Sequence, residues 1–163
     1  MPDNPTPTPD LGPDPHPHPD PDPLEPVHLL RAVSVEFGLR QAEFGAAHGM
    51  HPTDVRALFC LLDAARAGES ATAGLLAARL GLNSAGTTAV IDRLERLGHV
   101  TRSRDLVDRR RVLLQVSPEA VRLGRAAFGP LVDGLVELLG TFDPVERAAV
   151  TRFLSAARTA LAP

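Results

Sequence analysis

Residues 77–116 decide the fold, and they read AARLGLNSAGTTAVIDRLERLGHVTRSRDLVDRRRVLLQV. With the residues just before it, this stretch predicts a short helix over 72–80, a tight glycine turn and an amphipathic helix over 83–97. Two apolar strands, 100–104 and 111–116, then flank an arginine-rich tip. This order of elements is typical of the winged helix-turn-helix, which places its second helix in the DNA major groove and its hairpin beside it.

The second helix of this motif is bounded by residues that favour helix ends. Asn83 is a good N-cap, and Gly98 suits the position just past the C-terminus. The predicted buried face includes Thr87 and is otherwise formed by Val90, Ile91, Leu94 and Leu97. Small polar residues lie in the first turns of this helix, away from its buried face, and allow close approach to base edges and phosphates. The predicted DNA contacts on this helix are Ser84, Ala85, Thr88 and Arg93, with a solvated salt bridge to a nearby Asp or Glu as the alternative for Arg93.

The hairpin tip concentrates cationic side chains between two apolar strands. Arginine at such a tip can enter the narrow, electronegative minor groove. Asp108 would repel phosphate unless it orients an arginine, so we expect it to brace Arg110 within the protein. An ordinary charged hairpin without a DNA contact is the alternative. The predicted DNA-binding residues of the wing are Arg102, Arg104, Asp108, Arg109 and Arg110.

The formal charge of −3 conceals an uneven distribution of charge along the chain. Residues 1–26 carry six acids and no arginine, whereas residues 79–111 carry eight arginines and four acids. Phosphates respond to the local potential rather than to the sum over the whole chain. The charge pattern therefore agrees with a basic surface on the helix-turn-helix and its wing.

The chain divides into a tail and one predicted domain. Eleven of the 16 prolines lie in residues 1–26, which predicts a disordered, Pro/Asp-rich acidic tail. Residues 27–163 are long enough for one domain with its own core. We expect a mainly α fold with a small β-hairpin wing. Its winged helix-turn-helix spans about 52–116, and its remaining helices span about 27–48, 117–139 and 143–161.

Composition and motifs argue against several other classes of protein. No apolar run approaches the roughly 20 residues that cross a bilayer, and no secretory signal is visible at the N-terminus. A Gly-rich phosphate loop, a nucleophile with its base and a metal-ligand spacing are all missing from the sequence. We therefore expect a cytoplasmic protein that is not an enzyme and has neither a cofactor nor a membrane partner.

The chain resembles the multiple-antibiotic-resistance regulator (MarR) family over about residues 30–161. The resemblance is carried by Leu80-Gly81-Leu82, by 90–100, by 108–114 and by the helix start Ser117-Pro118-Glu119. It implies a homodimer whose first, fifth and sixth helices interlock, and which binds double-stranded DNA at a palindrome. The wing aspartate and arginine of the family correspond to Asp108 and Arg110 here, so the resemblance also implies that Arg110 is the minor-groove residue. Two positions depart from the family: Ala89, where a basic residue is common, and His51, where a hydroxyl cap is common.

The same resemblance implies a small-molecule or oxidant signal, read in a cleft between the dimer helices and the DNA-binding lobe. Cys60 lies in an apolar helix run, which favours inert packing over redox sensing. Zinc binding by His48 and His51 with Glu43 or His28 lacks a coherent ligand spacing. Metal binding by His16 and His18 has a plain linker as its alternative, because the two residues alternate with proline in the tail. The predicted cleft residues, for which core packing and helix-end roles are the alternatives, are Phe37, Phe44, His48, His51 and Phe59.

The leading interpretation is a ligand-responsive repressor that binds a palindromic operator as a homodimer. The alternative is a winged-helix protein-interaction module that has lost specific DNA readout. Ala89 and the overall charge of −3 support that alternative.

Overall fold

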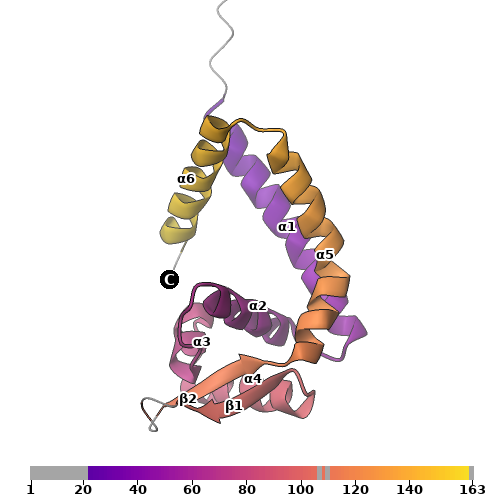
Figure 1. The fold of residues 1–163 in the computed structure, drawn as a ribbon, viewed down its shortest axis with the longest axis vertical. Helices are drawn as coiled ribbons and strands as arrows, with labels where there is room; N and C mark the ends of the chain where they lie inside the picture. Colours follow the sequence, from indigo (N-terminus) through magenta and orange to yellow (C-terminus); the bar gives the residue numbers. More distant parts are fainter. Residues whose placement is uncertain (1–21, 106–107, 109–110, 162–163) are drawn as a thin grey trace, which may run out of the picture. The chain divides into compact units, whose positions relative to one another are not determined.

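The computed structural model describes residues 22–105, 108 and 111–161. Figure 1 shows a helical fold with one two-stranded hairpin, which confirms the predicted fold class. The chain separates into two compact units, residues 1–37 and 38–163, and the helix-turn-helix lies within the second. The elements are α1 (Glu25–Ala47), α2 (Pro52–Arg66), α3 (Ala73–Leu80), α4 (Ser84–Arg96), β1 (Val100–Arg104), β2 (Val112–Val116), α5 (Pro118–Gly140) and α6 (Pro144–Ala160).

Several helices begin at polar cap residues. The side chains of Thr72, Asn83 and Ser117 each accept a hydrogen bond from the first turn of the following helix. Asp143 and Glu146 form a reciprocal capping box at the start of α6. Glu25 and Pro26 belong to α1 rather than to the predicted tail. Residues 1–21 of that tail lie outside the described residues.

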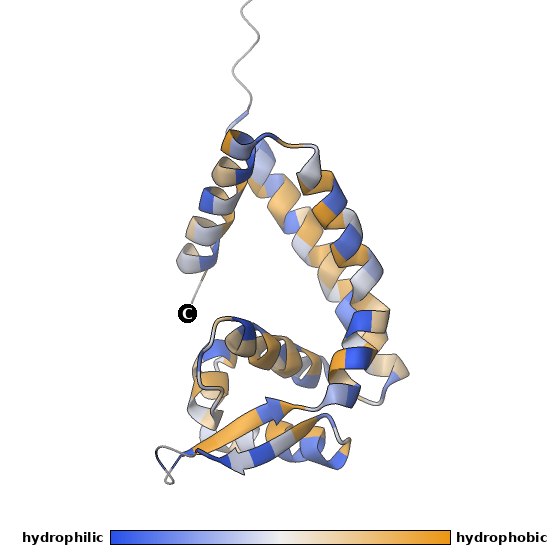
Figure 2. Ribbon diagram, viewed as in Figure 1, coloured by the Kyte–Doolittle hydropathy of each residue, from blue (hydrophilic) through white to orange (hydrophobic). Residues whose placement is uncertain are grey.

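The hydrophobic core lies between α2, α3, α4 and the hairpin. Figure 2 shows apolar residues along α2 and β2, and several of their side chains are almost fully buried. Gly45, near the end of α1, permits close approach to α2 and the residue before it, because a Cβ atom there would lie 3.0 Å from the Met50 carbonyl oxygen and 3.2 Å from Val55 Cγ2. The centre of the core is formed by Val55, Leu58, Leu61, Leu76, Val90, Ile91, Leu94, Val100 and Leu114.

The hairpin is antiparallel, and Arg102 lies opposite Leu114 in its register. The Leu114 N–H also donates to the Ala71 carbonyl at 2.8 Å, which ties β2 to the segment between α2 and α3. Leu114 is 4% exposed and belongs to the core. The wing is therefore attached to the helices through its second strand as well as through the chain that precedes it.

The last two helices leave apolar side chains exposed. No residue of α6 is buried, and Val145, Phe153 and Leu154 are 77%, 41% and 47% exposed. In α5, buried positions are confined to its first half, at Ala120 and Phe128. Exposed apolar faces of this extent favour association with another apolar surface. Among the described residues, no helix is both long and apolar enough to span a membrane.

Candidate nucleic-acid interface

The helix-turn-helix is formed by α3, a glycine turn and α4. Gly81 adopts the left-handed conformation with φ of 64°, and its N–H donates to the Ala77 carbonyl. A residue with a side chain would be strained there, which explains glycine at this turn. The Asn83 side chain then accepts from Gly86 N at 2.8 Å and starts α4.

The first turns of α4 present small side chains to solvent. Ser84, Ala85 and Thr88 are exposed, as the sequence predicts for DNA contacts. Thr87 is buried, and its hydroxyl donates to the Asn83 carbonyl at 2.9 Å, which confirms the predicted inward orientation. The sequence predicts Leu97 on the buried face, but it is 39% exposed, because it is the C-cap residue beyond the last turn of α4.

Arg93 points into the protein rather than freely into solvent. Its Nη2 lies 2.7 Å from Asp54 Oδ1, and its Nε lies 3.1 Å from Asp54 Oδ2. The Asp54 side chain is 0% exposed, whereas that of Arg93 is 28% exposed. The hydrogen bond to Asp54 raises the pKa of Arg93. The sequence left a solvated salt bridge with a nearby acid as the alternative to a DNA contact, but the partner of Arg93 is a buried carboxylate that is 39 positions away in the chain.

Asp54 has a second role at the start of α2. Its Oδ2 accepts from the His51 N–H at 2.9 Å, so one carboxylate both caps α2 and binds Arg93 of α4, the second helix of the helix-turn-helix or recognition helix. The sequence shows Asp54 only as an acid in the first turn of a helix. Its contact with Arg93 joins residues that are 39 positions apart, and no local pattern reveals it.

Arg102 is likewise engaged within the protein. Its Nη2 lies 2.7 Å from Asp92 Oδ1, and its Nη1 contacts Glu95 Oε2. Asp92 and Glu95 both belong to α4, whereas Arg102 belongs to β1. The hydrogen bond to Asp92, together with the charge of Glu95, raises the pKa of Arg102. Arg102 therefore connects the wing to the recognition helix.

The base of the wing tip is closed by Asp105 and Arg111. The Asp105 N–H donates to the Arg111 carbonyl at 3.0 Å, and Arg111 Nη1 lies 3.7 Å from Asp105 Oδ2. The Arg111 N–H also donates to the Asp108 carbonyl at 2.9 Å. The predicted contact of Asp108 with Arg110 stays a prediction, because Arg109 and Arg110 lie outside the described residues. Arg104 is exposed, as a DNA contact requires.

An aromatic cavity lies beside α2. The rings of Phe44 and Phe59 are 5.2 Å and 5.1 Å from the ring of Phe128. The three rings line a cavity of about 270 Å³ together with Val55 and Arg125. The sequence predicts Phe44 and Phe59 as cleft residues, but it indicates Phe128 only as part of an apolar helix stripe.

The other predicted cleft residues do not line this cavity. His48 donates from Nδ1 to the Phe44 carbonyl at 2.8 Å, and His51 precedes α2 as an exposed residue. Phe37 belongs to the other compact unit of the chain. Within the described part of the chain, no group of three or more His, Cys, Asp or Glu is placed to hold a metal ion. Burial raises the pKa of the Cys60 thiol, which disfavours the reactive thiolate.

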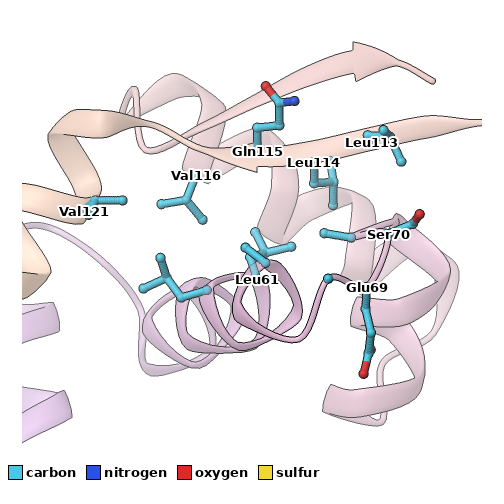
Figure 3. Close-up of a pocket in the computed structure, with 12 residues that line it drawn as sticks. Leu61, Glu69, Ser70, Leu113, Leu114, Gln115, Val116 and Val121 are labelled. Atoms are coloured by element: carbon cyan, nitrogen blue, oxygen red, sulfur yellow. The ribbon is translucent and has the colours of Figure 1, made fainter. Parts of the chain in front are cut away.

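A second groove runs between α2, β2 and α5. Figure 3 shows Leu61 and Leu114 pointing toward one another across it, while Gln115 and Glu69 turn away. This groove shares Leu62, Val116 and Val121 with the aromatic cavity. Its facing side chains are aliphatic, so they complete the packing of the wing against α2.

His99 is a buried histidine at the start of the wing. It is 8% exposed, and its Nδ1 has no hydrogen-bond partner among the described residues. Burial lowers the pKa of His99, and the charge of His48 lowers it further. The unfolded chain therefore binds more protons than the folded chain as pH falls below about 6.5, the usual histidine pKa. The contribution of His99 to folding stability is therefore full above that pH and is lost as the pH falls further, through the lowered pKa of the folded state.

We expect this titration to be visible in thermal unfolding. The unfolding temperature should fall between about pH 7.5 and pH 5.5, and His99→Leu should make that fall smaller because it removes the titrating group. His28→Leu, at an exposed position of α1, serves as the matched control and should keep the wild-type profile. If His99→Leu retains the full decrease, His99 is not the source of the pH dependence.

Comparison with known proteins decides the family of the chain. Residues 48–111 match the sequence model of the MarR family. Over 131 residues the chain is 30% identical to the uncharacterized HTH-type transcriptional regulator YcgE of Bacillus subtilis (strain 168), an alignment that covers 80% of this chain and 82% of YcgE. The chain belongs to the MarR family. It is a DNA-binding transcriptional regulator with a winged helix-turn-helix.

Solved MarR-type structures share its fold. A point mutant of MepR from a multidrug-resistant S. aureus clinical isolate superposes with a TM-score of 0.68 at 17% identity, covering 86% of this chain and 99% of that chain. The S. aureus MepR–DNA complex gives a TM-score of 0.53 at 17% identity, covering 83% and 98%. This MarR-family chain therefore has the architecture expected from its sequence.

Proposed function

We propose that this MarR-family protein is a ligand-responsive repressor that binds a palindromic operator as a homodimer. The observation that carries the proposal is the exposed start of α4, where Ser84, Ala85 and Thr88 present small side chains to solvent. Small hydroxyl and methyl groups on a recognition helix can approach base edges closely. The related MepR has been solved in complex with DNA, which supports DNA as the partner of this chain.

The wing supplies the cationic part of the proposed interface. Arg104 is exposed and precedes the tip, where Arg109 and Arg110 follow in the sequence. Arg111 is 47% exposed and stays at the base of the tip. We assign Arg110 to the minor groove, with Arg104 and Arg109 on phosphates, because wing arginines are attracted to narrow grooves. Arg93 and Arg102 contribute by holding the interface together.

Selection of binding sites from a random-sequence duplex pool tests this proposal. We expect an inverted repeat with half-sites about one helical turn apart, and an affinity that falls steeply with salt. Arg110→Ala should weaken binding by about 1–3 kcal/mol, measured by fluorescence anisotropy at matched salt. Arg66→Ala is the control, because Arg66 forms an exposed pair with Asp63 on α2.

Two outcomes would contradict parts of this function. Wild-type affinity for Arg110→Ala would show that the wing assignment is wrong. Intact dimerisation without salt-dependent DNA binding would instead favour a protein-interaction module, the alternative that Ala89 supports. Ala89 is exposed on α4 and adds no charge to its surface.

The aromatic cavity is the proposed effector site. A volume of about 270 Å³ lies near the lower end of ligand cavities, which suits a single aromatic ring. Arg125 is exposed and lines the cavity, so it can pair with a carboxylate on the ligand. Val55 lines the same cavity and is adjacent to Asp54, which binds Arg93 of α4. A ligand that displaces α2 would therefore also move α4 through the contact between Asp54 and Arg93.

We expect benzoate to bind this cavity better than benzyl alcohol, because only benzoate can pair with Arg125. A ligand at 100 times its dissociation constant stabilises the folded state by about 2.7 kcal/mol, which raises the unfolding temperature measurably. Benzoate should also release DNA in the anisotropy assay. Arg125→Gln should remove the preference for the carboxylate. If neither compound raises the unfolding temperature, that result would argue against an aromatic effector in this cavity.

A further inference from the structure

We propose that Arg102 is a positioning residue for DNA recognition, which anchors the wing strand to the recognition helix through Asp92 and Glu95 instead of contacting phosphate. The inference rests on the proposed DNA-binding function and deepens it, because it separates the arginines that touch DNA from those that arrange the interface. It also revises the sequence-based expectation that Arg102 is itself a DNA contact.

The geometry of the contact is that of a two-acid clamp. Two different nitrogens of one guanidinium reach two different carboxylates: Nη2 lies 2.7 Å from Asp92 Oδ1, and Nη1 contacts Glu95 Oε2. Asp92 and Glu95 are three positions apart, so they lie on one side of α4. A planar guanidinium with fixed donor directions holds such a pair in one orientation better than a flexible ammonium does.

The position of Arg102 in the hairpin directs it toward the helices. Its cross-strand partner is Leu114, which is buried in the core, so this face of the hairpin is the inward one. The base of the wing is held by other contacts, such as the Ser117 N–H donating to the His99 carbonyl at 2.9 Å. Arg102 is the side chain that fixes the middle of β1 on α4.

The clamp also changes the charge that DNA meets. Asp92 is 50% exposed and Glu95 is 29% exposed, and both belong to the helix that enters the major groove. Unpaired carboxylates there would repel phosphates. The guanidinium of Arg102 offsets this negative charge, and each of its two terminal nitrogens donates to one of the two carboxylates.

A double-mutant cycle on the full-length protein tests the inference. The probe is the duplex that wild-type protein selects from a random-sequence pool. Arg102→Gln should weaken binding about tenfold in the wild-type background, and less than about threefold in the Asp92→Asn/Glu95→Gln background. The salt slope of log K should stay within about half a unit of wild type for Arg102→Gln, because no phosphate contact is lost. Arg102→Lys should recover only part of the affinity.

A direct phosphate contact gives a different result. Arg102→Gln would then cost the same factor in both backgrounds, and the salt slope would fall by about one unit. That pair of results would overturn the inference. Arg66→Gln is the matched control, since it removes an exposed arginine–aspartate pair from α2 and should leave affinity and slope unchanged.

A measurement without DNA separates this inference from the proposed function. Hydrogen exchange on the free protein should show faster exchange of β1 amides in Arg102→Gln than in wild type or Arg66→Gln. If wild type selects no duplex but β1 exchange rises, the DNA-binding proposal fails while the anchoring of the wing is supported. Unchanged β1 exchange would refute the anchoring role whatever the outcome of the DNA experiments.

Discussion

Arg93→Ala is expected to destabilise the folded protein by about 3–5 kcal/mol, because it leaves a buried carboxylate without its cation. Asp54 is 0% exposed, and Arg93 provides its two closest side-chain donors. The loss is large against the roughly 5–15 kcal/mol that stabilises a typical domain. Urea unfolding followed by circular dichroism at neutral pH measures it directly.

The double variant Asp54→Asn/Arg93→Gln distinguishes loss of the ion pair from loss of packing. It removes both charges and keeps polar groups of similar size, so it should cost less than Arg93→Ala alone. Arg66→Ala, which breaks the exposed pair with Asp63, should change stability by less than about 1 kcal/mol. A loss of that small size for Arg93→Ala would mean that the pair with Asp54 does not support the fold.

Phe153→Asp is expected to convert the proposed homodimer into monomers and to lower operator affinity at least about 100-fold. Phe153 is 41% exposed in a helix that buries none of its residues, and Leu154 beside it is 47% exposed. A charge in an apolar interface would be desolvated without a partner. Separated recognition modules also lose the gain in affinity that comes from linking two half-site contacts.

Sedimentation velocity and anisotropy on the same samples measure both effects. Ser155→Asp is the matched control, because Ser155 is an exposed polar residue of α6 to which the same acidic side chain can be added. It should remain dimeric and bind with wild-type affinity. A Phe153→Asp variant that stays dimeric would place the subunit interface on another apolar surface, such as the exposed side chains of α1.

Much of this MarR-family fold could be predicted because its signals are local. N-cap residues such as Thr72 and Asn83 bind backbone groups three positions away, and Gly81 supplies a turn that other residues would strain. The inward orientation of Thr87 followed from helical spacing alone. The exposed start of α4 followed from the same spacing. Each of these features depends on residues within about one helical turn of one another.

The sequence by itself therefore determined the order of the elements, their bounds to within about two residues, and the place of the recognition helix and the wing. Only the tertiary structure decided what individual charges do. Arg93 meets Asp54 across 39 positions, and Arg102 meets Asp92 and Glu95 across ten and seven. Phe128 likewise joins Phe44 and Phe59 only when α5 packs beside α2. An arginine pairs with carboxylate as well as with phosphate, so its partner depends on which anion folding places within reach.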